Sequence, residues 1–339
     1  MSKRTILLTG AAGFIGSHVA RDLLRFYAGE YRIIAVDDLS GGFVENLPEG
    51  VEFVCADVSD PQIVNAIFKA FQPRFVFHLA AYAAEGLSFF IQNFNIRNNL
   101  IASVNLINGA VNYDVERFVF TSSIAVYGHA DPPVDESCPP QPADPYGIAK
   151  FAVEQSLRVA WEMFGLKYTV FRPHNVFGEY QNLGDPYRNV VGIFMNQMLR
   201  NQPLTIFGDG TQVRAFSYIA GVSWAIANCI QIEKAVNETY NVGTDQYYSI
   251  NELAEAVQLA FGRRAEITHL PQRNEVKDIY AKHDKAAAVF RDAPQVEFRV
   301  GIEKMARWAM NRGPMEPRKF TGIEVTKHMP PSWAQFTLQ

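Results

Sequence analysis

The chain has 339 residues, of which 48% are hydrophobic and 19% are charged, so it can bury a sizeable core and is not expected to be disordered. Its formal net charge is −4 without any block of basic residues, which argues against nucleic acid as a partner. No apolar run is long enough to span a membrane, and the three cysteines are too scattered for a metal or disulfide pattern. We therefore expect a cytoplasmic protein that contacts neither membrane nor nucleic acid and holds no metal.

The N-terminal part of the chain has the pattern of a dinucleotide-binding site. An apolar run at 5–9 predicts a buried strand, and the glycine-rich segment 10–16 leads into a helical pattern. In this arrangement the first N–H groups of the helix face a pyrophosphate. The next strand, 32–36, ends in Asp37, whose carboxylate suits a ribose diol, and no Arg or Lys directly follows Asp38 to hold a 2′-phosphate. The sequence therefore favours NAD over NADP.

Strand and helix patterns alternate along the first half of the chain. This alternation predicts an α/β protein with a Rossmann-type, doubly wound parallel sheet. Ligands of such sheets lie beyond the carboxyl ends of the strands. After the first two strands we expect strands at 51–56, 74–79, 117–121 and 167–171, and helices at 61–71, at 94–113 and from 145 to about 164.

The segment 144–150 places Tyr146 and Lys150 on one face of a helix, one turn apart. A phenol has a reference pKa of about 10, and a neighbouring ammonium favours the phenolate and lowers that pKa. The pair therefore suits abstraction of a proton, although taken alone it is also compatible with an ordinary helix surface. Ser123 follows the strand 117–121, so its hydroxyl is expected on the edge of the sheet where a ligand binds.

Joined in order, these motifs resemble those of the extended short-chain dehydrogenase/reductase family. They comprise the G-x-x-G-x-x-G turn at 10–16, Asp57 after the third strand, Ser123 ahead of Val-Tyr-Gly, and Tyr146 four residues before Lys150. Within this family the chain is similar to the 4-epimerases of UDP-glucose and UDP-galactose. The resemblance covers almost the whole chain. It implies a Rossmann-type NAD domain, a smaller C-terminal α/β substrate lobe and a nucleotide-sugar substrate of the UDP-hexose type.

The resemblance implies a role for each catalytic and cofactor-binding residue. Ser123 would bond the sugar hydroxyl that is oxidised, Tyr146 would take its proton, and Lys150 would hold the nicotinamide ribose. The residues implied in binding NAD are Gly10, Gly13, Phe14, Ile15, Gly16, Asp37, Asp38, Asp57, Val58, Leu79, Ala80, Ala81, Asn99, Ser122, Tyr146, Lys150 and Pro173.

The second half of the chain would bind the nucleotide sugar. Residues 1–172 would form the NAD-binding domain, to which the chain is expected to return around 214–243. Residues 173–213 and 244–339 would form the substrate lobe. The residues implied in substrate binding are Ser123, Asn175, Asn189, Val190, Leu204, Thr205, Phe207, Arg214, Arg273 and Glu275.

The chain departs from the family pattern at two positions. Ala215 and Gly221 stand where the family usually has aspartates, which would brace the phosphate-binding arginine. Two further features have no assigned role. Glu85 could contact the sugar or serve as an acid at a helix N-terminus, and the tail after Met315 carries no recognisable motif.

The residues after Ser123 favour one reaction. Dehydratases and decarboxylases of the family carry acidic residues there, whereas this chain has Ile124 and Ala125, which cannot transfer protons. Hydride taken from C4 of the hexose can then only return to the other face, which is epimerisation. The alternatives are a nucleotide-sugar C4 oxidase or reductase that exchanges its cofactor, a dehydratase of the same family, and an NAD-binding scaffold without catalysis.

The resemblance also implies a homodimer and a substrate preference. Family members dimerise through the helices that correspond to 94–113 and 146–164. The family pattern places Ile279 beside C2 of the hexose, or Tyr280 if the alignment shifts by one residue. A branched and stiff side chain there would disfavour an N-acetyl group. The expected substrates are therefore UDP-glucose and UDP-galactose rather than their N-acetylated forms.

Overall fold

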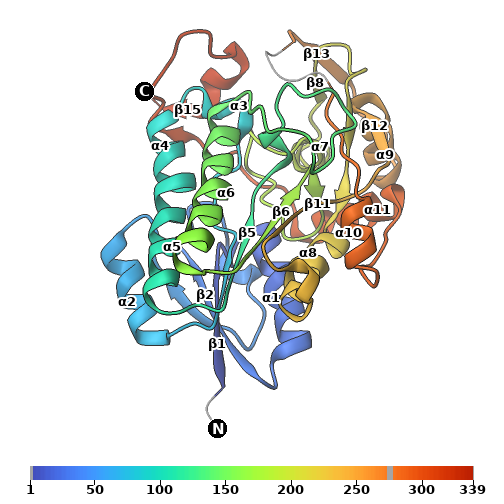
Figure 1. Ribbon diagram of the computed structural model, residues 1–339. Helices are drawn as coiled ribbons and strands as arrows, with labels where there is room; N and C mark the ends of the chain where they lie inside the picture. Colours follow the sequence, from blue (N-terminus) through green and yellow to red (C-terminus); the bar gives the residue numbers. More distant parts are fainter. Residues whose placement is uncertain (1–2, 273–277, 339) are drawn as a thin grey trace.

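The centre of the computed structural model, which describes residues 3–272 and 278–338, is a seven-stranded sheet in the order β11-β6-β5-β4-β1-β2-β3 (Figure 1). Every neighbouring pair is parallel. The predicted doubly wound sheet is confirmed, and its order reverses between β1 and β4, where such sheets bind ligands. The strands are β1 (Arg4–Thr9), β2 (Tyr31–Asp37), β3 (Glu52–Cys55), β4 (Phe75–His78), β5 (Arg117–Thr121), β6 (Tyr168–Pro173) and β11 (Glu238–Val242).

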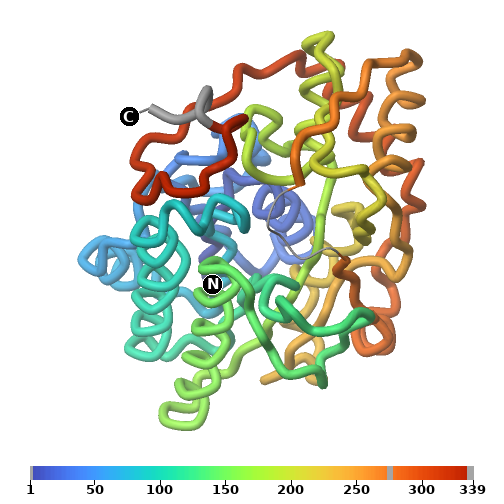
Figure 2. The backbone as a smooth tube through the Cα atoms, turned by 90° about the horizontal axis from the view of Figure 1, so that it is seen from above, coloured from blue at the N-terminus to red at the C-terminus, as the bar shows by residue number. Residues whose placement is uncertain are grey.

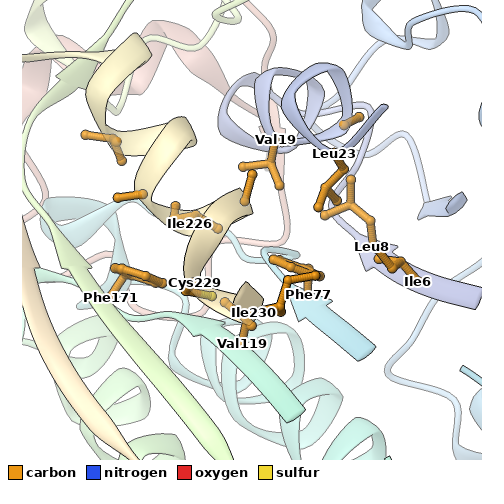
Figure 3. Packing of buried hydrophobic residues seen from close by; sticks show 14 of the residues in the cluster. Ile6, Leu8, Val19, Leu23, Phe77, Val119, Phe171, Ile226, Cys229 and Ile230 are labelled. Atoms are coloured by element: carbon orange, nitrogen blue, oxygen red, sulfur yellow. The ribbon is translucent and has the colours of Figure 1, made fainter. Parts of the chain in front are cut away.

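Alternate residues of the buried strands pack on opposite faces of the sheet. Ile6 and Leu8 of β1 belong to one apolar cluster, and Leu7 belongs to the other. Figure 3 shows the first cluster, in which Val19 and Ile226 from two helices meet the strands. Both faces are thus covered, as parallel sheets require. The helices are α1 (Phe14–Tyr27) and α8 (Ile219–Asn228) on the first face, and α2 (Pro61–Phe71), α5 (Ala102–Asn112) and α6 (Pro145–Phe164) on the second.

The single helix expected at 94–113 is divided. It consists of α4 (Gln92–Ile96), a π-helical turn η2 (Arg97–Ile101) and α5. The amide of Asn99 in this turn accepts a bond from Tyr82 N at 2.9 Å and donates one to Tyr82 O at 3.1 Å. The wider turn therefore serves to hold the loop after β4, a long-range contact that helical periodicity does not reveal.

A smaller α/β lobe lies against the carboxyl edge of the sheet. Its apolar cluster includes Phe194, Leu253 and Ile302 from three helices.

No helix of residues 3–272 and 278–338 is long and apolar enough to cross a membrane. The lobe contains α7 (Val190–Leu199), α9 (Ile250–Ala260), α11 (Phe298–Arg312) and the strand pairs β7 (Val176–Phe177) with β10 (Ser217–Tyr218), β8 (Leu204–Phe207) with β13 (Ile267–Leu270), and β9 (Val213–Ala215) with β12 (Tyr247–Ser249). The remaining helices and strands are α3 (Glu85–Ser88), α10 (Asp284–Val289), β14 (Phe320–Thr321) and β15 (Thr337–Leu338).

Candidate active site

A cavity of about 560 Å³ lies between the carboxyl edge of the sheet and the smaller lobe. Most residues assigned from the sequence line it. Asn99 and Leu204 do not, because both are fully buried behind the wall. Arg273 and Glu275 lie outside the described residues. The assigned residues at the cavity are Gly10, Gly13, Phe14, Ile15, Gly16, Asp37, Asp38, Asp57, Val58, Leu79, Ala80, Ala81, Ser122, Ser123, Tyr146, Lys150, Pro173, Asn175, Asn189, Val190, Thr205, Phe207 and Arg214.

The glycine turn forms a cradle that suits a pyrophosphate. Gly10 has φ +69°, and a Cβ there would lie 2.5 Å from the backbone nitrogen of Ala80. A Cβ on Gly16 would lie 2.0 Å from the carbonyl oxygen of Gly10. Helix α1 begins after Gly13 without a side-chain cap and without an acidic residue in its first turn. Its first N–H groups, at the cavity, are therefore suited to an anion.

Acidic residues also line this half of the cavity, and Asp37 lies beside the glycine turn. Asp37 is buried, and its carboxylate accepts bonds from Ala12 N at 3.0 Å and Leu39 N at 2.8 Å. Burial raises the pKa of Asp37, and the backbone donors oppose that shift. Asp57 accepts a bond from Ser59 N at 2.8 Å. The two carboxylates are thus oriented by the backbone, and they fit the ribose and adenine of NAD.

Helix α6 brings the proposed base to the cavity. Asp144 caps its first turn by accepting a bond from Gly147 N at 2.8 Å, and Pro145 occupies the first helical position. Tyr146 and Lys150 are 5% and 2% exposed. The Nζ atom of Lys150 donates to Thr121 O at 2.9 Å and lies 5.8 Å from the centre of the Tyr146 ring.

The electrostatics of this pair differ from the sequence-based expectation. Burial raises the pKa of Tyr146, the charge of Glu85 raises it further, and a hydrogen bond with Ser123 opposes the shift. Burial lowers the pKa of Lys150 to about 7. The pKa of the phenol is therefore raised rather than lowered in the protein chain alone, because desolvation disfavours both charged forms.

A buried polar network continues along the face of α6 that carries Tyr146 and Lys150, starting one turn beyond Lys150. Arg172 donates to both carboxylate oxygens of Glu154, at 3.0 and 2.5 Å. Ser122 donates to Glu154 at 2.5 Å, and Arg172 also donates to the Tyr127 hydroxyl at 2.7 Å. The network joins α6, β6 and the end of β5. It therefore holds three segments that carry site residues in fixed relative positions.

The substrate side contains two asparagines in an unusual backbone conformation. Asn175 has φ +40° and Asn189 has φ +58°, a region that asparagine tolerates better than most residues. Asn189 donates to Val176 O at 2.5 Å and caps α7 by accepting a bond from Val191 N at 3.2 Å. Outliers of this kind are often found at ligand sites. Arg214, on β9, lines the same part of the cavity.

The structure explains two departures from the family pattern and corrects one expectation. A Cβ on Gly221 would lie 2.7 Å from Pro294 O, so an aspartate does not fit there. Ala215 is fully buried, where an unpaired carboxylate would be unfavourable. Ile279 packs on the cluster around Tyr127 and is not among the described residues that line the cavity. The expected gate at Ile279 is therefore not found in the structure.

Several residues at the cavity carried no signal in the sequence. Arg188 pairs with Asp185 at 2.8 Å, and its guanidinium lies 5.2 Å from the centre of the Tyr82 ring. These residues come from loops whose spacing is irregular, so only the folded chain brings them together. The lining residues that the sequence did not indicate include Tyr82, Gln181, Asp185, Tyr187, Arg188, Pro317, Ser332 and Trp333, and Glu85 had no assigned role.

The fold and this site define an NAD-dependent enzyme, and the chain belongs to the NAD-dependent epimerase/dehydratase family, which it matches over residues 6–243. A UDP-glucose 4-epimerase of Mycolicibacterium smegmatis is 32% identical over 316 residues, which cover 90% of this chain and 98% of the relative. The solved structure of UDP-glucose 4-epimerase from Thermotoga maritima with UDP-glucose has a TM-score of 0.84 at 34% identity and covers 91% of this chain and 99% of its own. The solved structure of UDP-glucose 4-epimerase from Thermus thermophilus with NAD has a TM-score of 0.84 at 32% identity. The match covers 90% of this chain and 99% of that structure's chain.

Proposed function

We propose that the protein catalyses epimerisation at C4 of a UDP-hexose, such as UDP-glucose or UDP-galactose, through a transient 4-keto sugar. This proposal rests on the residues that follow Ser123. Ile124 and Ala125 form the short turn after it and are both buried. Neither can protonate a leaving group, so a ketose formed beside Ser123 would be reduced again rather than dehydrated.

The residues of the chain divide the work of this reaction. Tyr146 takes the proton of the sugar O4 as hydride leaves C4, and bound NAD supplies the redox chemistry. Ser123, whose side chain is hydrogen-bonded to that of Tyr146, orients O4 of the sugar. Lys150 holds the nicotinamide ribose and contributes positive charge beside the phenolate. When the ketose presents its other face, the same proton and hydride return, so the cycle involves no net oxidation.

We assign the nucleotide to the smaller lobe. Asn175 and Arg214 would bind the diphosphate, since a guanidinium suits phosphate oxygens. Asn189, Val190, Thr205 and Phe207 would enclose the uracil. Thr205 is held by Gln197, whose Nε2 donates to its hydroxyl at 2.8 Å. Leu204, fully buried on β8, would support this wall without contact to the ligand. Arg273 and Glu275 remain proposed contacts to phosphate and ribose.

A dehydratase is the second candidate because of Glu85. This residue lines the cavity, and its charge raises the pKa of Tyr146, so a carboxyl group does lie near the redox centre. It begins the short helix α3, which also suits a helix N-terminal acid. If Glu85 acts on the substrate, it could transfer a proton to a departing hydroxyl. If it serves only as the acid at the N-terminus of α3, it could not.

Deuterium at C4 of UDP-glucose separates the candidates. An epimerase returns the label to C4 of UDP-galactose. A dehydratase moves it to C6 with loss of water, an oxidase leaves it on released NADH, and a scaffold leaves the sugar unchanged. Nuclear magnetic resonance of the product of the purified protein identifies the outcome. Label on C4 of both epimers supports the proposal, and any other position overturns it.

We also propose a homodimer through α6 and the helical segment formed by α4, η2 and α5. Exposed apolar side chains lie along these helices, including Ile101, Ile148, Met163 and Phe164, the last two being 69% and 66% exposed. Apolar groups of this size at a helix surface favour a partner surface. Light scattering at micromolar concentration should give twice the chain mass, and the Phe164→Asp variant should give a monomer. A monomeric parent protein would contradict this interface.

The division of the chain between cofactor and substrate is proposed as well. We assign residues 1–172 to the NAD-binding domain, to which the chain returns within 214–243 after β10, because β11 pairs with β6 in the main sheet and α8 packs on α1. Residues 173–213 and 244–339 form the substrate lobe. We place the enzyme in the cytoplasm, which suits free thiols at Cys55, Cys138 and Cys229.

A further inference from the structure

The end of the chain crosses the cavity rather than extending away from the substrate lobe. We define residues 315–333 as the C-terminal strap. Figures 1 and 2 show this part, in red, leaving the side of α11 and ending beside α3 and α4. Arg318 N donates to Gly184 O at 2.8 Å, and its guanidinium donates to Ser40 O at 3.1 Å. The strap therefore joins the two halves of the molecule above the cofactor site.

The far end of the strap is anchored to the NAD-binding half. The carboxylate of Glu324 accepts bonds from Asn93 N at 2.7 Å and Phe94 N at 2.9 Å, at the start of α4. The helix has no cap of its own, so Glu324 satisfies two N–H groups that would otherwise lack a partner. Glu324 N also donates to Phe90 O at 2.8 Å. These contacts fix the strap at a defined position.

The inner face of the strap forms part of the cavity wall. Pro317, Ser332 and Trp333 line the cavity, and Trp333 is only 3% exposed. The indole packs edge to face on Tyr187, with centroids 5.2 Å apart, and on Phe90, at 6.1 Å. Trp333 thus lies in the same apolar cluster as residues from α3 and from the loop after β7.

Trp333 lines the same cavity as Tyr146 and is linked to it through Tyr187 and Arg188. Its partner Tyr187 precedes Arg188, whose charge lowers the pKa of Tyr146 while burial raises it. Arg188 lies over Tyr82, and Tyr82 contacts Phe320 of the strap at 5.6 Å. The cavity that Tyr146 lines therefore has aromatic wall residues that are distant from it in sequence.

We propose that the C-terminal strap is the outer wall of the hexose pocket and that Trp333 is a residue that determines hexose binding and retention of the 4-ketose. The inference rests on the proposed epimerisation. In that reaction the C4–H bond breaks with its electron pair passing to NAD⁺, and the O4 proton passes to Tyr146. The ketose must then turn over without leaving, because its loss would strand NADH on the enzyme. An aromatic ring face suits this step, since it excludes water and contacts a sugar mainly through apolar packing, which does not fix one face of the sugar.

The binding test compares the affinities for UDP-glucose and UDP by calorimetry, in a Tyr146→Phe background in which turnover is slow. Trp333→Ala should lower the affinity for UDP-glucose about tenfold, which corresponds to a loss of 1.4 kcal/mol in binding free energy. The affinity for UDP and the amount of bound NAD should not change. Trp333→Phe should restore most of the affinity. Val325→Ala is the matched control, because Val325 is an exposed strap residue that does not line the cavity. Equal weakening of UDP and UDP-glucose, or no weakening, would overturn the proposal.

The retention test uses the Trp333→Ala enzyme with its tyrosine intact. During turnover of UDP-galactose it should accumulate enzyme-bound NADH, seen by absorbance, and release a 4-ketose that borohydride traps in the filtrate. The parent and Val325→Ala enzymes should show neither. A variant that epimerises without NADH accumulation contradicts retention by Trp333. Failure of the Tyr146→Phe protein to bind any UDP-hexose would instead overturn the proposed function, and with it this inference.

Discussion

The Nζ atom of Lys150 lies 5.8 Å from the centre of the Tyr146 ring, with both side chains buried one turn apart on α6. Burial raises the pKa of Tyr146 and lowers that of Lys150 to about 7. A phenolate and an ammonium at this distance stabilise each other, and a positively charged nicotinamide nearby would add to that effect. The site is therefore arranged so that the phenolate is favoured only when its positively charged neighbours are in place.

Replacement of the proposed base should abolish most activity without changing the fold. Tyr146→Phe removes only the hydroxyl, so we expect bound NAD and the free energy of unfolding to be close to those of the parent. Turnover of UDP-galactose should fall by about 10²–10⁴-fold, the usual contribution of a positioned acid–base group. Steady-state kinetics measure this change. Activity within threefold of the parent would show that another group takes the proton.

The glycine cradle predicts a loss of cofactor in Gly10→Ala. The added Cβ would lie 2.5 Å from Ala80 N, and the backbone at Gly10 has φ +69°, which an alanine rarely adopts. We expect the purified variant to retain much less NAD, measured after denaturation and release of the nucleotide. Gly29→Ala is the control, because no atom lies within 4 Å of its added Cβ. Equal NAD content in the two variants would refute the role of the cradle.

The buried ion pair between Glu154 and Arg172 should contribute strongly to the free energy of unfolding. Glu154→Ala leaves Arg172 buried without its carboxylate partner, which should lower the free energy of unfolding by about 3–5 kcal/mol. Glu162→Ala on the same helix removes an exposed pair with Arg158 and should change it by less than about 1 kcal/mol. Denaturant unfolding of both variants tests the contrast. Similar losses of unfolding free energy in the two variants would show that burial does not make the Glu154–Arg172 pair more stabilising than an exposed pair.

Acid should destabilise the fold through two buried histidines. Burial lowers the pKa of His78 and of His174 to about 3, from about 6.5 in an unfolded chain. The unfolded chain therefore binds protons that the fold excludes, so this stability is complete above about pH 6.5 and is lost as the pH falls toward 3. Each histidine should contribute a slope of about 1.4 kcal/mol per pH unit in that window.

Denaturant unfolding at several pH values between about 7 and 5 measures this slope. His78→Asn removes one titrating group, so the variant should lose stability less steeply with falling pH than the parent, whatever its absolute stability. His269→Asn is the matched control, because His269 is exposed. An unchanged slope in the His78→Asn variant would show that His78 does not exclude protons from the fold.

Much of the cofactor half was readable from the chain because its signals are local. The turn at 10–16 needs glycines partly for local reasons, because Gly10 has a positive φ and a Cβ on Gly16 would meet the carbonyl oxygen of Gly10. Asp37 follows an apolar run that predicts a strand. Tyr146 and Lys150 share a helix face through the period of the helix alone. Features of this kind depend on covalent geometry and short-range hydrogen bonds, so the printed sequence is sufficient to predict them.

The sugar end of the cavity was decided by tertiary structure. Trp333, Tyr187 and Arg188 come from a tail and a loop without periodicity, and only long-range packing brings them to the cavity that Tyr146 lines. The same holds for the shifts in pKa, because desolvation depends on how completely distant segments cover a side chain. The expected gate at Ile279 was not found for this reason. Whether an irregular segment faces the ligand or the core depends on packing with residues remote in sequence, which local pattern does not encode.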